Sequence, residues 1–375
     1  MKNKILVTSL AVIIWIISII NLSGFGEAHN TQSKTSFILI FIGILFILNR
    51  LIKKPFVPIK ELLIIFSISS VFILSSNFQG YRYDGIKYLT VFLLVYIVSN
   101  FKIDELQLKI ISVIYGLLGL FILYVFNYRT VLSGWNPNSI AMIAIFSYLV
   151  YIISYIHKYS LNEKVPPIIV SIVYIYFMEI TESRGSIFII ILSILIICNV
   201  IPIKKIYASN LGIILILIIP LIVAVFVTNI SINSDINTLN EWSMEKFEKP
   251  LFNGRDEIWI DGFNQLSKNI LFGSGYINSG YWHNCAMSCL TSYGVIGYIL
   301  WILALKTILC RGYKYFDDNL VIGCMTSFLL IIIQQSYELG LFSITMNLIP
   351  YFILGLLLGR IRELKGKYSY ESVTS

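Results

Sequence analysis

The sequence predicts an all-α, polytopic membrane protein, and three observations support this fold class. Hydrophobic residues make up 57% of the 375 residues and charged residues only 13%, whereas a soluble domain has roughly a quarter of its residues charged. The mean hydropathy is +0.81. The apolar residues also gather in segments close to the roughly 20 residues that a helix needs to cross a bilayer. We therefore expect a single transmembrane bundle over residues 1–375, without a separate soluble domain.

About twelve transmembrane helices are expected, because backbone amides in lipid must be satisfied within each segment. The segments are 4–20, 36–52, 60–76, 86–99, 108–127, 138–157, 166–181, 186–201, 211–230, 284–305, 319–336 and 340–359. The first of them has no convincing small-residue cleavage site after it, so we interpret it as a helix rather than a signal peptide.

The basic residues predict how the bundle is oriented. An even number of helices places both termini on one side, and 19 of the 28 Lys and Arg residues lie on that side. Lys and Arg are retained in the cytoplasm when a membrane protein inserts, so both termini are expected to be cytoplasmic. The net charge of +8 is then an orientation signal, and no nucleic-acid partner is expected.

Neither the spacing of the cysteines nor any recognisable sequence motif indicates a metal or a cofactor. The five cysteines lack metal-ligand spacing, and Cys285 and Cys289 lie four residues apart on an expected helix. Small apolar packing residues are the favoured interpretation of this pair, and a disulfide is the alternative. The sequence contains no P-loop, dinucleotide fingerprint, catalytic triad motif, zinc signature or internal repeat. Neither a metal nor a cofactor is therefore expected.

The fifth helix leads into NYRTVLSGWNPNSIAM (127–142). A turn with a helix cap at Asn138 or Ser139 fully explains this sequence. The indole of Trp135 and the side-chain amides of Asn136 and Asn138 would equally suit the faces and hydroxyl groups of a sugar. Both interpretations stay open for this element.

A very short turn joins the seventh and eighth helices in MEITESRGSIF (178–188). Glu179, Glu182 and Arg184 must lie at or inside the outer interface, where ionisable residues are costly and usually face the bundle interior or a water-filled cavity. Ser183 can cap the eighth helix, whose free amides and adjacent Arg184 predict an anion site. The less favoured alternative is an Arg–Glu pair that ties two helices together.

One long loop, residues 231–283, follows the ninth helix and is expected outside the cell. Its spacing predicts short amphipathic helices that lie on the membrane or over the bundle. Arg255 begins the second of these helices, and its planar guanidinium can bind two phosphate oxygens at once. A glycine-rich run then leads to Trp282, His283 and Asn284. A lone loop histidine is usually a surface residue, but this one enters a membrane helix at the depth of the other candidates, which favours function.

The expected topology places all these polar elements on the same side of the membrane, together with Glu338 at the end of the eleventh helix. Two arginines suit a lipid-linked diphosphate, and a histidine can take up a proton near neutral pH. Asn, Trp and Tyr side chains suit sugars, and Glu182 and Glu338 complete the expected substrate-binding set. These residues together predict glycosyl transfer from a diphosphate leaving group outside the cell.

The order of these motifs resembles that of the O-antigen ligase/polymerase superfamily over about residues 60–350. The motifs are NPN (136–138), SRG (183–185), GRDEIW (254–259), GSG (273–275) and HN (283–284). The length of the chain is most similar to that of a Wzy-type polymerase. The resemblance implies a GT-C-like, metal-independent glycosyltransferase in the cytoplasmic (inner) membrane of a bacterium. Its activity would be polymerisation of undecaprenyl-diphosphate-linked repeat units of O-antigen (lipopolysaccharide), capsule or exopolysaccharide.

The resemblance also implies roles for individual residues. Arg184 and Arg255 would neutralise the diphosphate as charge builds on the leaving group. His283 would act as general base for the acceptor hydroxyl or would orient a diphosphate oxygen. The side chains expected to position sugars are Asn284, Asn138 and Trp282.

The expected partners are lipid-linked oligosaccharides and membrane lipids, with a flippase and a chain-length regulator as further candidates. An O-antigen ligase that transfers the glycan to lipid A–core is the main alternative. A flippase or transporter of lipid-linked oligosaccharides is less favoured, because it predicts deep charged residues in several helices and an inverted repeat. The sequence contains neither feature.

Overall fold

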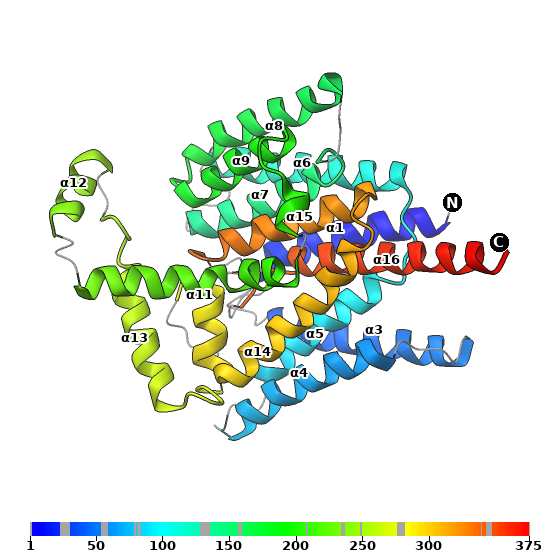
Figure 1. Cartoon of the computed structure of the whole chain (residues 1–375), viewed down its shortest axis with the longest axis horizontal. Helices are drawn as coiled ribbons and strands as arrows, with labels where there is room; N and C mark the ends of the chain where they lie inside the picture. Colours follow the sequence, from blue (N-terminus) through cyan, green and yellow to red (C-terminus); the bar gives the residue numbers. More distant parts are fainter. Residues whose placement is uncertain are drawn as a thin grey trace.

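The structure is a computed structural model of the whole chain, and its regular elements are helices. It describes residues 2–22, 31–53, 59–78, 80, 84–127, 136–156, 160–207, 209–233, 237–247, 250–275, 282–338, 340–342 and 347–374, and no strand occurs within these ranges. The helices are α1 (Lys2–Leu22), α3 (Thr31–Lys53), α4 (Ile59–Phe78), α5 (Asp84–Val98), α6 (Glu105–Asn127), α7 (Pro137–Ile152), α8 (Leu161–Glu179), α9 (Arg184–Ile197), α10 (Ile203–Ile206), α11 (Asn210–Asn233), α12 (Asn237–Phe247), α13 (Arg255–Lys268), α14 (Cys285–Tyr313), α15 (Asn319–Gln334) and α16 (Ile349–Thr374) (Figure 1).

The helices form the bundle of a membrane protein. Each of the twelve apolar segments expected from the sequence overlaps a helix. Within the described residues, three helices are long and apolar enough to cross a membrane: Glu105–Phe126, Asn210–Ile232 and Cys285–Tyr313. Membrane crossing by the other apolar helices stays a prediction.

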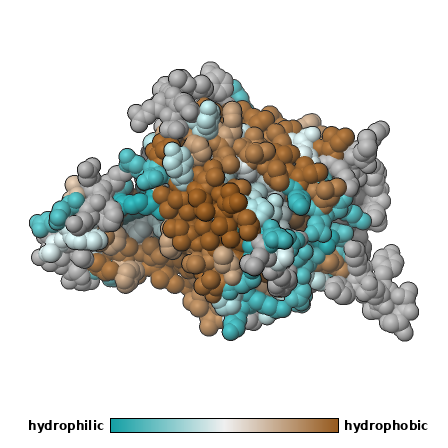
Figure 2. All heavy atoms as spheres, turned by 90° about the horizontal axis from the view of Figure 1, so that it is seen from above, coloured by the Kyte–Doolittle hydropathy of each residue, from teal (hydrophilic) through white to brown (hydrophobic). Residues whose placement is uncertain are grey.

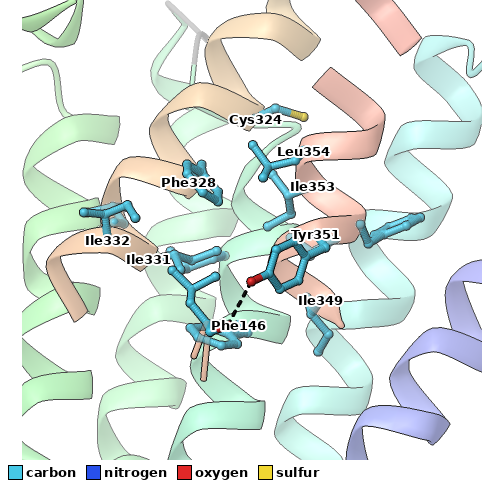
Figure 3. Packing of buried hydrophobic residues seen from close by; sticks show 14 of the residues in the cluster. Phe146, Cys324, Phe328, Ile331, Ile332, Ile349, Tyr351, Ile353 and Leu354 are labelled. Atoms are coloured by element: carbon cyan, nitrogen blue, oxygen red, sulfur yellow. Dashed lines mark hydrogen bonds between the residues drawn. The ribbon is translucent and has the colours of Figure 1, made fainter. Parts of the chain in front are cut away.

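Helices α7 and α15 form the centre of the bundle. Every residue of α7 from Ile140 to Ile152 is buried, and α15 is buried over most of its length. A helix that is apolar all round lies either in a protein core or in lipid, and the burial of α7 and α15 shows that other helices surround these two. The cluster around Phe146, Phe328 and Tyr351 shows this packing, and the Tyr351 hydroxyl donates a hydrogen bond of 2.8 Å to the carbonyl of Leu341 (Figure 3).

Peripheral helices expose apolar side chains on the outside of the bundle. Phe41 of α3, Leu117 of α6 and Tyr176 of α8 are each more than 60% exposed. Figure 2 shows a broad hydrophobic area in the middle of one face, with hydrophilic residues to either side of it. A soluble monomer rarely exposes apolar surface of this extent, so this surface suits contact with lipid.

Helix α14 is broken at Gly294, although its sequence reads as one apolar helix. Gly294 has φ 67° and ψ −173°, a backbone conformation outside the helical region. The amides of Val295 and Ile296 donate instead to the carbonyls of Ile270 and Leu271, at 2.9 and 3.3 Å. The segment after α13 therefore binds the backbone groups that the break releases. In Figure 1 the short first part of α14 runs beside α13 and turns sharply into the second part.

Two expected boundaries were wrong. The last helix begins at Ile349 rather than at residue 340, because the side chain of Asn347 accepts a hydrogen bond of 3.0 Å from the Ile349 amide and starts the helix there. The cap of α7 is Asn136 rather than Asn138 or Ser139, since its side chain accepts from the Asn138 amide at 2.9 Å.

Candidate functional site

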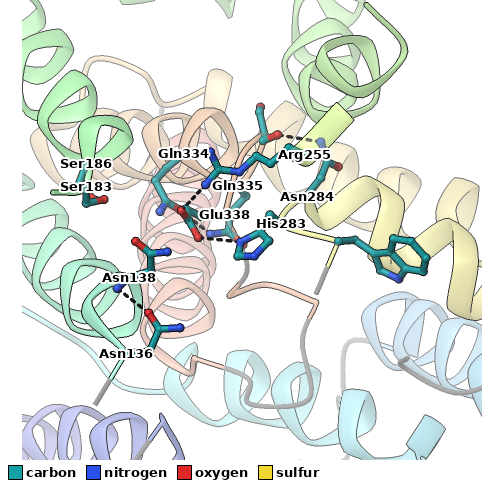
Figure 4. A network of polar contacts seen from close by, with 12 residues as sticks. Asn136, Asn138, Ser183, Ser186, Arg255, His283, Asn284, Gln334, Gln335 and Glu338 are labelled. Atoms are coloured by element: carbon teal, nitrogen blue, oxygen red, sulfur yellow. Dashed lines mark hydrogen bonds and ion pairs between the residues drawn. The ribbon is translucent and has the colours of Figure 1, made fainter. Parts of the chain in front are cut away.

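The carboxylate of Glu338 joins two residues that the sequence had placed in the site. Its Oε1 accepts a hydrogen bond of 2.8 Å from Nη2 of Arg255, and its Oε2 lies 3.3 Å from Nδ1 of His283 (Figure 4). The Glu338 side chain is 11% exposed, and those of Arg255 and His283 are 21% and 25% exposed. The three groups are thus largely shielded from solvent. Charges in such an environment interact more strongly than they do in water.

Helix α13 places Arg255 in the site. The helix starts after Gly254, which has φ 74° in the left-handed region and so lets the chain turn directly into Arg255. One turn later, the indole NH of Trp259 donates to the carbonyl of Trp282. A Cβ atom at Gly262 would lie 2.7 Å from Cε of Met287, so α13 packs closely on α14. These contacts fix the distance between the start of α13 and the residues beside His283.

His283 adopts an uncommon backbone conformation between two anchored neighbours. Its φ is 46°, in the left-handed region that residues other than glycine rarely occupy. Asn284 caps α14 by accepting from the amides of Ala286 and Met287 at 2.9 and 3.1 Å. Backbone strain of this kind costs about 1–3 kcal/mol and persists where the surroundings determine it. Strained residues of this kind cluster at active sites, which favours a functional role for His283.

Asn284 and Trp282 hold the scaffold of the site in this structure. The Asn284 amide is fully buried and donates to the carbonyls of Pro220 in α11 and Ser336 after α15, at 2.7 and 2.8 Å. Trp282 is 5% exposed and packs with Trp259 in a small apolar cluster. Asn284 was expected to contact sugars, but its side-chain amide is instead bonded to three elements beside His283. The same expectation for Trp282 stays a prediction, because its indole NH is buried without an acceptor within the described residues.

The SRG turn, in which Arg184 begins α9, packs against the segment that carries Glu338. A Cβ atom at Gly185 would lie 2.4 Å from Cε2 of Tyr337, so the SRG turn packs against the residue that precedes Glu338. Arg184 itself is exposed, as are Glu179 and Glu182. All three ionisable residues of the turn are therefore outside the bundle interior, and the expectation that they face a water-filled cavity stays a prediction.

The expected cap of α9 was also wrong in its detail. Ser183 occupies the cap position but makes no capping hydrogen bond with its side chain. Its hydroxyl and that of Ser186 are instead 2.9 Å apart, and both residues are buried. Only the backbone carbonyl of Ser183 bonds to the first turn of α9, where it accepts from the amides of Ser186 and Ile187 at 3.1 and 3.2 Å.

The NPN turn reaches the same region from α7. A Cβ atom at Gly340 would lie 2.7 Å from the Met142 sulfur, so the segment after Glu338 packs on the first turns of α7. Figure 4 shows the Asn138 side chain directed toward the Glu338 cluster, with Asn136 beside it. Asn136 is exposed and Asn138 is half-buried. Trp135 lies outside the described residues.

The site contains buried donors that have no acceptor within the described residues. These are Nε of Arg255, Nε1 of Trp282, Nε2 of Gln334 and the hydroxyl of Tyr337. Burial raises the pKa of the Tyr337 hydroxyl, with Glu338 raising it further and Arg255 opposing, so this group stays protonated. Buried donors are almost always paired in proteins, and a bound ligand or water would satisfy these groups. Core donors such as those of Tyr298 and Trp301 lack acceptors as well, so the feature is not confined to the site.

Sequence reasoning missed Gln334 and Tyr337. The signal was present in QQSYE (334–338), a polar run at the end of an apolar helix and at the depth of the other candidates. Neither residue stands out in the sequence by itself. The placement of Tyr337 near Arg255 and Gly185 depends on contacts between distant parts of the chain.

The described residues contain no group of three or more His, Cys, Asp or Glu side chains that could hold a metal ion. All five cysteines are free thiols, and Cys285 and Cys289 are buried. The packing interpretation of this cysteine pair is thus confirmed.

A family model described as O-antigen ligase, Wzy_C, matches residues 169–302. This match supports kinship with the O-antigen ligase/polymerase superfamily. It includes Arg184, Arg255 and His283 and ends before Glu338. No curated protein and no solved structure matches the chain.

Proposed function

We propose that the chain is a bacterial inner-membrane glycosyltransferase that polymerises undecaprenyl-diphosphate-linked oligosaccharide repeat units. The growing glycan would be transferred from its diphosphate carrier to a sugar hydroxyl of another lipid-linked repeat unit, at the extracytoplasmic face. The product would be an O-antigen, a capsule or an exopolysaccharide. The reaction would need no metal ion.

One observation carries this proposal: an arginine and an imidazole share one partly buried carboxylate, among donors that lack acceptors. Arg255 and His283 both contact Glu338. The buried Nε of Arg255 and the Tyr337 hydroxyl need acceptor atoms, which the oxygens of a diphosphate supply in number. The guanidinium fork is well suited to such oxygens.

In the proposed reaction, the arginines act on the leaving group and His283 acts on the acceptor. The acceptor oxygen forms a bond to the anomeric carbon as the bond from that carbon to the diphosphate breaks. Arg255, with Arg184 at the adjacent helix start, neutralises the charge that develops on the departing diphosphate. His283 accepts the proton of the acceptor hydroxyl, which is the role of a general base. Asn138, whose side chain is directed toward the Glu338 cluster, would bind a sugar hydroxyl (Figure 4).

A ligase that transfers the glycan to lipid A–core is the second candidate, because the matching family model carries the description O-antigen ligase. Donor, leaving group and catalytic residues would be the same in both cases. The two activities differ only in the acceptor.

The test is reconstitution of the purified protein in vesicles with undecaprenyl-diphosphate-linked repeat units, in EDTA. Wild type is expected to give a ladder of products, which His283→Ala loses while keeping its fold. No ladder but transfer to added lipid A–core would make the chain a ligase. If neither product forms and lipid-linked oligosaccharide crosses the vesicle membrane instead, the protein is a transporter and the proposal is wrong. A ladder lost in EDTA would overturn metal independence.

A further inference from the structure

We propose that Glu338 is a positioning residue that fixes the tautomer and the orientation of His283. The carboxylate divides its two oxygens between two neighbours, Oε1 to Arg255 and Oε2 to Nδ1 of His283. This inference rests on the proposed function, in which His283 is the general base. Glu338 lies beyond the part of the chain that matches the O-antigen ligase model.

The first step of the argument concerns the proton on the imidazole. An ionised carboxylate only accepts hydrogen bonds, and Glu338 already accepts one of 2.8 Å from Arg255. The nitrogen that faces it, Nδ1, must therefore carry the proton. In the neutral ring this leaves the lone pair on Nε2, which is the nitrogen able to take the proton of a hydroxyl group.

The second step concerns orientation. Glu338 follows the Ser336 carbonyl that binds the buried Asn284 amide, and the Cys285 amide donates to the Gln335 carbonyl at 3.0 Å. The segment that carries Glu338 is thus tied to both residues that follow His283. Ring and carboxylate are held by the same backbone junction, which keeps their relative position fixed.

The third step concerns charge during the reaction. When Nε2 accepts a proton, the imidazole becomes a cation, and the Glu338 carboxylate lies 3.3 Å from its Nδ1. An adjacent carboxylate stabilises such an imidazolium. Arg255 shares the same carboxylate, so binding of a diphosphate to the guanidinium would leave more of the Glu338 charge to His283.

The test reads the tautomer directly by nitrogen NMR. The chain has three histidines, so the His29→Gln/His157→Gln variant labelled with ¹⁵N-histidine reports on His283 alone. At a pH of roughly 8.5, above the ordinary range of histidine, we expect Nδ1 protonated and Nε2 unprotonated. Glu338→Ala is expected to shift the population toward the Nε2-protonated tautomer. Glu338→Gln keeps an acceptor for Nδ1 and is expected to retain the wild-type tautomer.

Glu257→Ala is the matched control, because it removes an exposed carboxylate from α13 two residues after Arg255. An Nε2-protonated ring in the parent protein would overturn the proposal. Equal spectra for Glu338→Ala and Glu257→Ala would also overturn it. These readouts need no activity, so they separate failure of this inference from failure of the proposed function.

The kinetic readout separates positioning from substrate binding. Glu338→Ala is expected to lower kcat on the order of 10²-fold without raising KM for the lipid-linked repeat unit, and Glu338→Gln is expected to restore part of kcat. A raised KM with unchanged kcat would make Glu338 a substrate ligand and contradict the positioning role. Unchanged kinetics would leave the Glu338 contacts as a structural tie and contradict it as well.

Discussion

At the scale of single residues, the site depends on side chains that are shared between neighbours. The Glu338 carboxylate contacts both Arg255 and His283. The side-chain amide of Asn284 caps α14 and donates hydrogen bonds to α11 and to the segment after α15. A shared group couples its partners, because removal of it leaves several buried atoms unsatisfied at once. Substitutions here should therefore affect more than one element.

Asn284→Ala is predicted to destabilise the protein by about 3 kcal/mol, because it removes a helix cap and leaves two buried carbonyls without a donor. Asn136→Ala is the control, since it removes an exposed cap from α7 and should cost about 1 kcal/mol. Thermal unfolding in detergent measures both. Equal shifts of the unfolding temperature would mean that the interhelical hydrogen bonds of Asn284 contribute nothing.

Arg255→Lys is predicted to lower the transfer rate by about tenfold to a hundredfold although the charge is kept. A lysine lacks the planar fork that binds two oxygens at once. Lys268→Ala serves as control, because it removes a positive charge from the other end of α13. A rate for Arg255→Lys equal to that of wild type would show that only charge matters at this position.

At the scale of elements, the corner of α14 connects the loop helices to the bundle. A Cβ atom at Gly294 would lie 2.2 Å from the Leu271 carbonyl oxygen, and one at Gly273 would lie 2.5 Å from the Ser292 carbonyl carbon. Ser75 of α4 also donates to the Phe272 carbonyl at 2.5 Å. The two glycines thus permit a close approach of two backbones, which fixes α13 and with it Arg255.

Gly294→Ala is predicted to cost about 3 kcal/mol or more, because φ near +67° with extended ψ is available almost only to glycine and the new methyl group would clash. Gly254→Ala is the matched control: it also has a positive φ but has nothing within 4 Å of an added Cβ, so it should cost about 1 kcal/mol. Unfolding temperatures compare the two. Similar losses would argue that the corner tolerates a side chain.

The sequence allowed the helices to be predicted but not the contacts between them. Each apolar segment overlaps a helix. Arg255 and His283 were expected in one site because the topology places both on the same side of the membrane, and in the structure both contact Glu338. The break at Gly294 was missed, since an apolar run with a single glycine reads as a continuous helix. Glu338 was named as a candidate, but its contacts with Arg255 and His283 were not predicted, because these partners lie 83 and 55 positions away in the chain.

At the scale of the whole molecule, the candidate site and the two termini lie at opposite ends of the bundle. In Figure 1 the starts of α7, α9 and α13 lie at the left, whereas the N and C labels lie at the right. This arrangement agrees with the distribution of basic residues, which predicts cytoplasmic termini and an extracytoplasmic site.

Labelling with a membrane-impermeant maleimide tests this orientation. Cys198 is exposed at the end of α9, whereas Cys285, Cys289 and Cys324 are buried. Cys198 should react in inside-out vesicles and stay unlabelled in intact spheroplasts. In a Cys198→Ser/Cys310→Ser background, Glu257→Cys should react in spheroplasts. The reverse pattern would invert the topology and place the site in the cytoplasm.

The most direct test of the central claim measures release of undecaprenyl diphosphate from a reconstituted, lipid-linked donor. The wild type, His283→Ala, Arg255→Ala and the double variant are compared in a single turnover, with Lys268→Ala as control. Each single variant should lose at least about 10²-fold, and the double variant should be little slower than the worse single one, because residues that act as a unit are not additive. A correctly folded His283→Ala or Arg255→Ala protein that releases the carrier at a rate near that of wild type would contradict the account.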